Sequence, residues 1–218
     1  MKKFLLLTFL SLALFAKNMA ILAVQWFPSV CKVERYKECQ RPLPNWRENL
    51  TLHGLWPQGR SYCHISARIK ILDKRGYWEK IPLSLSPELK NLLYTYMPGS
   101  FSGLYKHEWV KHGSCYGDPE HYFLDSIALL SQINDSDVRT FFIEHRGRRI
   151  QTYKIRKAFD KAFGKGSGKR VRFICKRGYL TEMRLYLRGK ITPQTSLGTL
   201  LKRARPTRIG CSIGIIAR

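Results

Sequence analysis

Short apolar runs separated by turn residues predict that the chain contains both strands and helices. The run over 21–27 (ILAVQWF) is β-rich and ends at a proline, which is typical of a central strand entering a turn. A second strand is expected over 50–55, where Trp-Pro-Gln-Gly follows with turn chemistry. Later strands are expected over 171–175 and 180–187, the second because it alternates as LTEMRLYL.

Helix start signals fall between these runs. A Ser-Pro pair at 86–87 is a typical cap and first helical position, and Pro-Gly at 98–99 ends the apolar stripe that follows. Asp-Pro at 118–119 opens another helix in the same way. Further helices are expected over 101–113, 136–143 and 154–163. The whole pattern predicts an α+β fold with a central, mostly antiparallel sheet flanked by helices.

The glycine-rich stretch at 164–169 (GKGSGK) resembles part of a phosphate-binding loop. It lacks the four-residue spacer and the Lys-Ser/Thr ending of that motif. We therefore expect a flexible loop.

The N-terminus predicts export. Two lysines precede an apolar run over 4–16, which is typical of a signal peptide and too short to span a bilayer. We assign 1–20 to this leader, with cleavage between 16 and 23, and 21–218 to one catalytic domain. No later stretch approaches about 20 consecutive apolar residues, so we expect a monomeric periplasmic or secreted protein without a membrane span.

The charge is concentrated in the C-terminal part. Residues 1–138 contain 17 Lys+Arg and 12 Asp+Glu, whereas residues 139–218 contain 22 and 3, within a total net charge of +24. Such a basic surface attracts polyanions. RNA, DNA, lipopolysaccharide or acidic lipid would all fit, and a merely solubilising surface stays an alternative.

The six cysteines indicate disulfides in an exported chain, although composition alone allows fifteen pairings. The chain has no CxxC motif and no Cys/His cluster with zinc-ligand spacing, which disfavours structural zinc. We expect a single disulfide-bonded domain.

Two segments concentrate chemically active residue types: LHGLWP at 52–57 and HEWVKHGSC at 107–115. On a helix, Glu108, Lys111 and His112 share one face. A carboxylate beside an imidazole favours the protonated ring and a lysine opposes it, so this cluster suits a histidine that titrates near neutral pH.

A zinc protease motif does not explain the second segment. Its two histidines stand at i and i+5, about 140° apart on a helix, whereas HExxH needs i and i+4 to grip one metal. A GxSxG elbow is also absent.

Metal-independent RNA cleavage fits these residues better. RNA supplies its own nucleophile, the 2′-hydroxyl, and needs only a base, an acid and positive charge around the phosphoryl oxygens. Lys111 and a protonated His107 would provide that charge. DNA lacks the 2′-hydroxyl and would not be cut this way.

The two segments, extended to LTLHGLWPQG and KHEWVKHGSC, resemble the active-site segments of the T2 family of secreted ribonucleases. AVQWFPSVC resembles the first core strand of that family, and CKRGYLTEMRLYL a late strand. Residues 64–100 and 139–170 match weakly.

The resemblance implies an endoribonuclease of single-stranded RNA that needs no cofactor and no metal. His53 and His112 would form the acid and base pair, with His112 as base in the first step, which yields a 2′,3′-cyclic phosphate. His107, Glu108 and Lys111 would support the phosphate. It also implies three disulfides: Cys31 with Cys39, Cys63 with Cys115, and Cys175 with Cys211.

Base recognition is expected at Trp56, Gln58, Tyr62 and Tyr105. Gln58 stands where many family members have an acidic residue, and Leu104 and Tyr105 replace the usual Phe-Trp. These departures predict a permissive pocket and low base specificity. The alternative function is a catalytically silent cationic protein that binds RNA or anionic surfaces.

Overall fold

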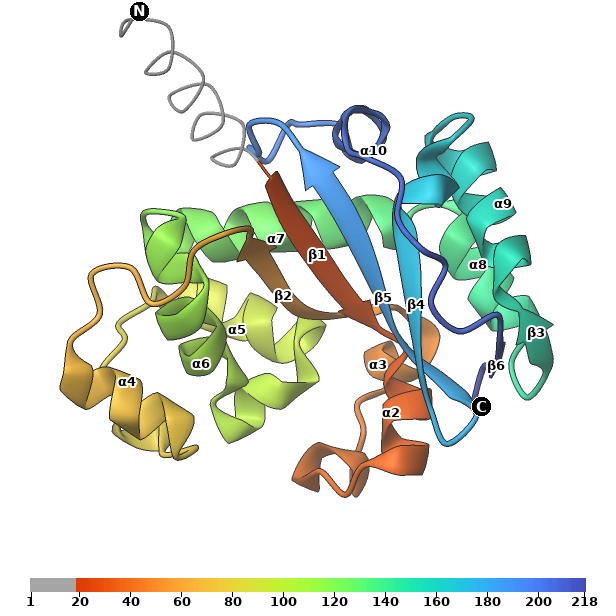
Figure 1. Ribbon diagram of the computed structural model, residues 1–218. Helices are drawn as coiled ribbons and strands as arrows, with labels where there is room; N and C mark the ends of the chain where they lie inside the picture. The colour runs from red at the N-terminus through yellow and green to blue at the C-terminus, as the bar shows by residue number, and fades with distance from the viewer. Residues whose placement is uncertain (1–18) are drawn as a thin grey trace, which may run out of the picture.

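The computed structural model describes residues 19–218, so the predicted leader lies almost wholly outside the described residues. Its sheet has the order β2-β1-β5-β6-β3, with β4 paired to β5, and every named pair is antiparallel except β5 with β6 (Figure 1). The strands are β1 (Met19–Gln25), β2 (Thr51–Pro57), β3 (Arg149–Gln151), β4 (Val171–Lys176), β5 (Tyr179–Arg188) and β6 (Ile213–Ile215). The predicted α+β class with a mostly antiparallel sheet is confirmed.

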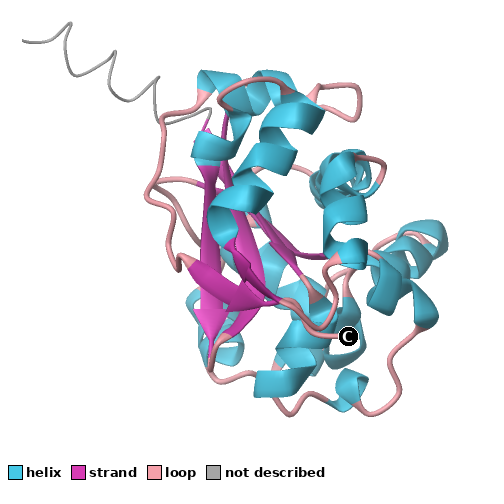
Figure 2. Cartoon of the chain, turned by 90° about the vertical axis from the view of Figure 1, so that its right-hand side faces the viewer, coloured by secondary structure: helices cyan, strands magenta, loops and turns pink. Residues whose placement is uncertain are grey.

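The helices surround this sheet unevenly. Helix α7 lies behind the strands in Figure 1, and Figure 2 shows the sheet near one side of the molecule with most helices on the other. The α-helices are α2 (Phe27–Val33), α3 (Pro44–Glu48), α4 (Ala67–Lys74), α5 (Pro87–Tyr96), α6 (Leu104–Lys111), α7 (Pro119–Asn134), α8 (Asp137–Glu144), α9 (Thr152–Phe163) and α10 (Leu197–Arg203). The 3-10 turns are η1 (Lys37–Cys39), η2 (Trp78–Lys80), η3 (Pro98–Ser102), η4 (Gly113–Cys115) and η5 (Ser167–Arg170).

The polar caps begin the helices as predicted. The side chains of Ser86, Asp118 and Ser136 each accept a hydrogen bond from a backbone N–H in the first turn of α5, α7 and α8. The helix expected over 101–113 is shorter, because η3 precedes it and α6 ends at Lys111.

Two local predictions are wrong in detail. The first strand ends at Gln25, and helix α2 begins at Phe27 because Pro28 fits its first turn. The second half of the stretch expected to be a flexible loop, 167–169, belongs to η5, in which Ser167 and Gly168 are buried. A Cβ on Gly168 would lie 2.1 Å from the Arg156 carbonyl oxygen, so this turn is packed tightly against α9.

The main core lies between one face of the sheet and α7. Leu22 of β1, Leu55 of β2 and Leu185 of β5 are fully buried there with Leu129 and Leu130 of α7. One face of the sheet therefore packs against the core, and the other face can carry polar side chains.

Three disulfides link the described residues, in the pairing that the resemblance implied. The bond between Cys63 and Cys115 connects the loop after β2 to η4, directly after α6, across 52 residues. It therefore fastens together the two segments that carry the candidate site. The other two bonds join Cys31 to Cys39 and Cys175 to Cys211.

Candidate active site

A β-bulge in β2 turns His53 away from the core. Gly54 pairs with Ala23 and Leu52 pairs with Val24, so His53 is the additional residue where the register shifts. Regular alternation would place His53 on the same face as the buried Leu55. The bulge instead brings it to the open face of the sheet, where its ring lies 5.2 Å from that of Trp56.

Two carboxylates lie beside the His53 ring. Its Nδ1 is 2.6 Å from Glu182 Oε2 of β5, and its Nε2 is 3.6 Å from Glu108 Oε1 of α6. Burial opposes the charged ring, but the bond to Glu182 and the charge of Glu108 outweigh it and raise the pKa of His53. His53 is therefore disposed to carry a proton near neutral pH.

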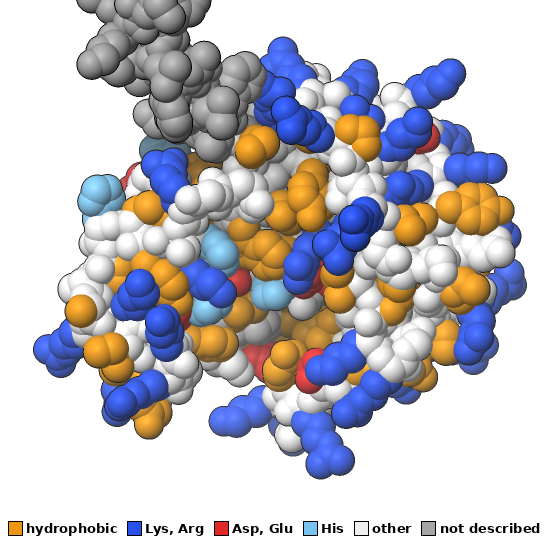
Figure 3. Space-filling view, viewed as in Figure 1, with side chains coloured by type: hydrophobic (Ala, Val, Ile, Leu, Met, Phe, Trp, Pro, Cys, Tyr) orange, Lys and Arg blue, Asp and Glu red, His pale blue; other side chains and the backbone are white. Residues whose placement is uncertain are grey.

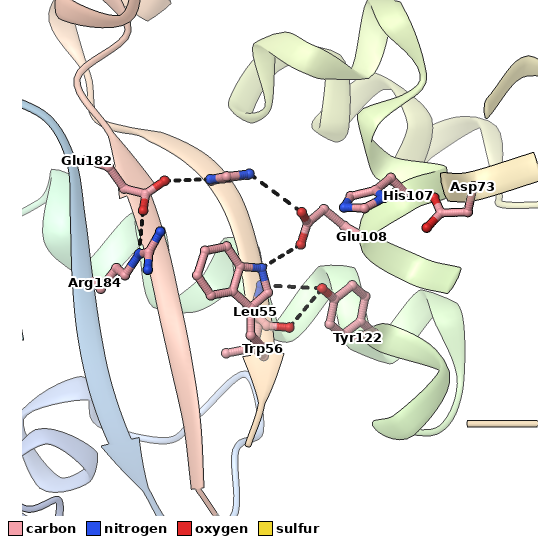
Figure 4. Close-up of polar contacts among 9 residues, drawn as sticks. Leu55, Trp56, Asp73, His107, Glu108, Tyr122, Glu182 and Arg184 are labelled. Atoms are coloured by element: carbon pink, nitrogen blue, oxygen red, sulfur yellow. Dashed lines mark hydrogen bonds and ion pairs between the residues drawn. The ribbon is translucent and has the colours of Figure 1, made fainter. Parts of the chain in front are cut away.

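Glu182 is itself held by two cations. Burial would raise the pKa of its carboxyl, but hydrogen bonds from His53 and from Arg184 Nε, at 2.6 Å, lower it below the ordinary value. Figure 4 follows these contacts from Arg184 through Glu182 towards Glu108 and Trp56. The ionised Glu182 fixes the His53 ring with Nδ1 as the donor, which leaves Nε2 to face a substrate.

Glu108 lies at the centre of the cluster and is 1% exposed. Trp56 Nε1 donates a hydrogen bond to its Oε2 at 2.7 Å. Burial raises the pKa of Glu108, against the opposing effects of His53, His107, Trp56 and Lys111. The carboxylate needs a neighbour without a side chain, because a Cβ on Gly54 would lie 1.9 Å from Oε2.

His112 has the opposite electrostatic environment to His53. It caps the C-terminal end of α6 and stacks on Trp56, with ring centroids 5.4 Å apart. Its Nδ1 is buried without a hydrogen-bond partner among the described residues. Burial, followed by the charges of Lys111, His107 and His53, lowers the pKa of His112 to about 3. The ring is therefore neutral at physiological pH.

His107 and Lys111 complete the helix-borne part of the cluster. His107 lies 6.4 Å from His112, ring to ring, and its Nδ1 is 2.7 Å from Asp73 Oδ1 of α4. The ring of Trp78 lies 5.2 Å from that of His107. The charge of Lys111 acts on both His112 and Glu108.

The four residues expected to recognise bases lie in different surroundings. Trp56 is inside the cluster, in contact with the rings of both His53 and His112, and Gln58 donates a hydrogen bond to the Trp56 carbonyl. Tyr62 donates its hydroxyl to Asp73, the same carboxylate that holds His107. Tyr105 packs beside Phe123 against the main core. Trp56 is thus the member of this set that touches both candidate catalytic rings.

Sequence reasoning missed the three residues that fix the histidines from outside the two motifs: Glu182, Arg184 and Asp73. A signal for the first two exists, because charges at alternate positions of LTEMRLYL share one strand face. Asp73 has no comparable signal, since its role depends on how α4 packs against α6.

Two negative findings apply to the described part of the chain. Residues 19–218 contain no cluster of three or more His, Cys, Asp or Glu side chains arranged to hold a metal ion. Within the same range, no helix is long and apolar enough to cross a bilayer.

Comparison with known proteins decides the family. The sequence profile of the ribonuclease T2 family matches residues 17–196. The chain belongs to the ribonuclease T2 family. It is 28% identical over 221 residues to Ribonuclease I of Escherichia coli, covering 87% of this chain and 82% of that protein. It is 30% identical over 158 residues to mouse Ribonuclease T2-A, covering 66% of this chain and 54% of the other. The sequence-based prediction of a T2-type endoribonuclease is confirmed at the level of family.

Solved structures show the same T2 fold. The self-incompatibility-associated SF11-RNase of Nicotiana alata superposes with a TM-score of 0.62 at 18% identity, covering 92% of this chain and 99% of the other. Human RNase T2 gives a TM-score of 0.52 at 19% identity, with coverage of 92% and 97%. At such low identity the likeness supports the fold alone.

Proposed function

We propose that this T2-family endoribonuclease cleaves single-stranded RNA without a metal, through a 2′,3′-cyclic phosphate. One observation supports this most directly: His53 and His112 flank Trp56, and their surroundings move their pKa values in opposite directions. Two groups of the same type thereby acquire the two protonation states that acid and base catalysis requires.

In the first step, neutral His112 takes the proton of the ribose 2′-hydroxyl through Nε2, because its Nδ1 is buried. The 2′ oxygen attacks phosphorus, and the 5′ oxygen of the next nucleotide leaves with the proton of His53. In the second step a water molecule gives a proton to His53 and attacks phosphorus. The 2′ oxygen then leaves with the proton held by His112, and both histidines return to their starting states.

The helix-borne residues stabilise the charge that develops on the phosphoryl oxygens. Lys111 and His107 supply positive charge, and Glu108 orients Trp56 through the bond to its indole N–H. We assign base contacts to Trp56 and Gln58, with Tyr62 at the edge of the site. Because stacking tolerates any base, low base specificity follows.

We also propose that the protein is exported. The basic leader, the three disulfides and the basic surface suit a monomer that acts on RNA in a periplasm or outside the cell.

The test is cleavage of a defined single-stranded RNA in excess EDTA, with mass analysis of the fragments. We expect cyclic-phosphate ends from the wild type and a loss of cleavage of about 10³- to 10⁴-fold in His53→Ala and in His112→Ala. Cleavage that EDTA abolishes and that extends to DNA would indicate a metal-dependent nuclease. Binding of RNA without any cleavage would indicate the silent cationic protein.

A further inference from the structure

We propose that the open face of the sheet extends the active site into a platform for single-stranded RNA, on which Tyr186 stacks a base and Arg172 binds a phosphate. The proposal rests on the function proposed above and concerns the nucleotides that flank the scissile phosphate. It extends a site formed by β2, α6 and the Glu182–Arg184 part of β5 further along β5 and onto β4.

The strand register places these side chains in two neighbouring rows. Across the first row, Trp56 pairs with Ile21, and Ile21 pairs with Tyr186. Residues paired across neighbouring strands project from the same face. Because Trp56 belongs to the active site, Tyr186 lies on the active-site face.

The second row runs parallel to the first. Gly54 pairs with Ala23, Ala23 with Arg184, and Arg184 with Arg172. The guanidinium of Arg184 lies 5.1 Å from the Trp56 ring centroid, which ties this row to the first. Ile21 and Ala23 of β1 therefore lie between β2 and the strands β5 and β4, which carry Tyr186, Arg184 and Arg172.

This face is accessible. The intervening residues of β5, Met183, Leu185 and Leu187, are buried in the core, whereas Arg172 is exposed and Tyr186 is half-buried. Figure 3 shows the same face hollowed, with histidines at its centre, an apolar floor, and Lys and Arg side chains along one side. Helix α7 covers the opposite face (Figure 1).

The chemistry selects a single-stranded polyanion. Aromatic rings on a sheet stack unpaired bases, and the guanidinium of arginine matches phosphate oxygens. Glu182 is the acidic residue of β5 on this face, and its charge is already matched by His53 and Arg184. The platform also continues into the C-terminal part of the sequence, which holds most of the positive charge.

The distance across the sheet determines how long an RNA must be to contact the platform. Neighbouring strands lie about 4.8 Å apart, so Tyr186 stands about 10 Å across the sheet from Trp56, and Arg172 about 14 Å from Gly54. A dinucleotide held at the scissile phosphate does not need to reach that far. A longer RNA does.

The experiment measures cleavage of two substrates by the purified protein after removal of the leader. One is a dinucleoside monophosphate, and the other is an oligonucleotide with a single ribonucleotide in a 2′-deoxy strand, extended by several nucleotides on both sides. For Tyr186→Leu and Arg172→Gln we expect kcat/KM on the oligonucleotide to fall by about tenfold, while dinucleotide cleavage is unchanged. Arg172→Gln should also reduce the slope of log(kcat/KM) against log salt by about 0.7. Oligonucleotides extended on one side only then locate the bound flank.

The matched control is Lys154→Gln, which removes an exposed cation from α9 and should leave both substrates unaffected. Equal losses on both substrates, or no loss on either, would overturn the platform. If the wild type cleaves neither substrate, the proposed catalytic function fails. In that case fluorescence anisotropy with a fully 2′-deoxy oligonucleotide still tests the platform, which requires weaker binding by both variants and is overturned by unchanged binding.

Discussion

The site joins a strand-borne half to a helix-borne half, and the two treat a histidine in opposite ways. On the strand side, Glu182 accepts a hydrogen bond from the His53 ring and favours its charged form. On the helix side, His112 stacks on Trp56 beside Lys111, and its buried Nδ1 has no hydrogen-bond partner within residues 19–218. The comparison shows that neighbours, and not residue type, shift the pKa values of these two histidines in opposite directions.

The largest effect is expected from removing either ring. His53→Ala and His112→Ala should each lower kcat/KM by about 10³ to 10⁴, the range of positioned acid–base groups. In the wild type, activity should fall at low pH as His112, with a pKa of about 3, becomes protonated. It should fall at high pH as His53 loses its proton above its raised pKa. His112→Ala should lose the fall in activity at low pH, and His53→Ala should lose the fall at high pH.

The control for this prediction is His145→Ala. The His145 ring contacts Phe141 of its own helix by stacking and by a hydrogen bond to its carbonyl. A comparable loss of activity in this variant would mean that the effect is one of folding.

The second-largest effect is expected from removing the disulfide that joins the two halves. Replacing Cys63 and Cys115 together by serine should lower the free energy of unfolding by about 4 kcal/mol, because their separation of 52 residues closes a long loop. Replacing Cys31 and Cys39, separated by 8 residues, should cost only about 2.5 kcal/mol. Urea denaturation measures both, and equal losses would contradict the loop-length argument.

A substitution that pushes the strand-borne and helix-borne halves apart at one contact should lower the free energy of unfolding by less. Gly54→Ala places a Cβ against Glu108 Oε2 and should cost about 1 to 3 kcal/mol, with a loss of activity as the carboxylate moves. Gly59→Ala is a useful comparison, since its Cβ would meet no atom within 4 Å although its φ is +79°. Full activity in Gly54→Ala would show that Glu108 does not need its present position.

The smallest effect is expected from the partner of His53. Glu182→Gln removes the charge that raises the pKa of His53, so the alkaline limb of kcat/KM should move to lower pH. At neutral pH the loss should be about tenfold, and it should shrink as the pH falls and His53 regains its proton. A loss that is independent of pH would instead indicate a structural role for Glu182.

The two halves also differ in how far the sequence reveals them. His107, Glu108, Lys111 and His112 fall within six consecutive residues, so local spacing alone places them together. Glu182 lies 129 residues from His53, and only the pairing of β1 between β2 and β5 brings them into contact.

The fold divides in the same way. Caps such as Ser86 act within a few residues and were predicted correctly, as was the α+β class. The three-residue strands β3 and β6 were not, because each depends on a distant partner and not on its own periodicity. The bulge at His53 was not predicted either, although the glycine that follows His53 inside the strand run is a weak signal for a bulge.

The position of β1 has a consequence for biosynthesis. This strand starts at Met19, so it overlaps the last two residues of the segment assigned to the leader, and it supplies the middle of the β2-β1-β5 arrangement. A signal peptidase that cut after Ala23 would delete the residues that bridge Trp56 and Tyr186, whereas a cut after Ala16 would leave the strand whole. The mass of the processed protein distinguishes the two cuts, and we expect the earlier one. The position of the cut would then determine both how the protein is processed and whether the sheet that carries its active site is complete.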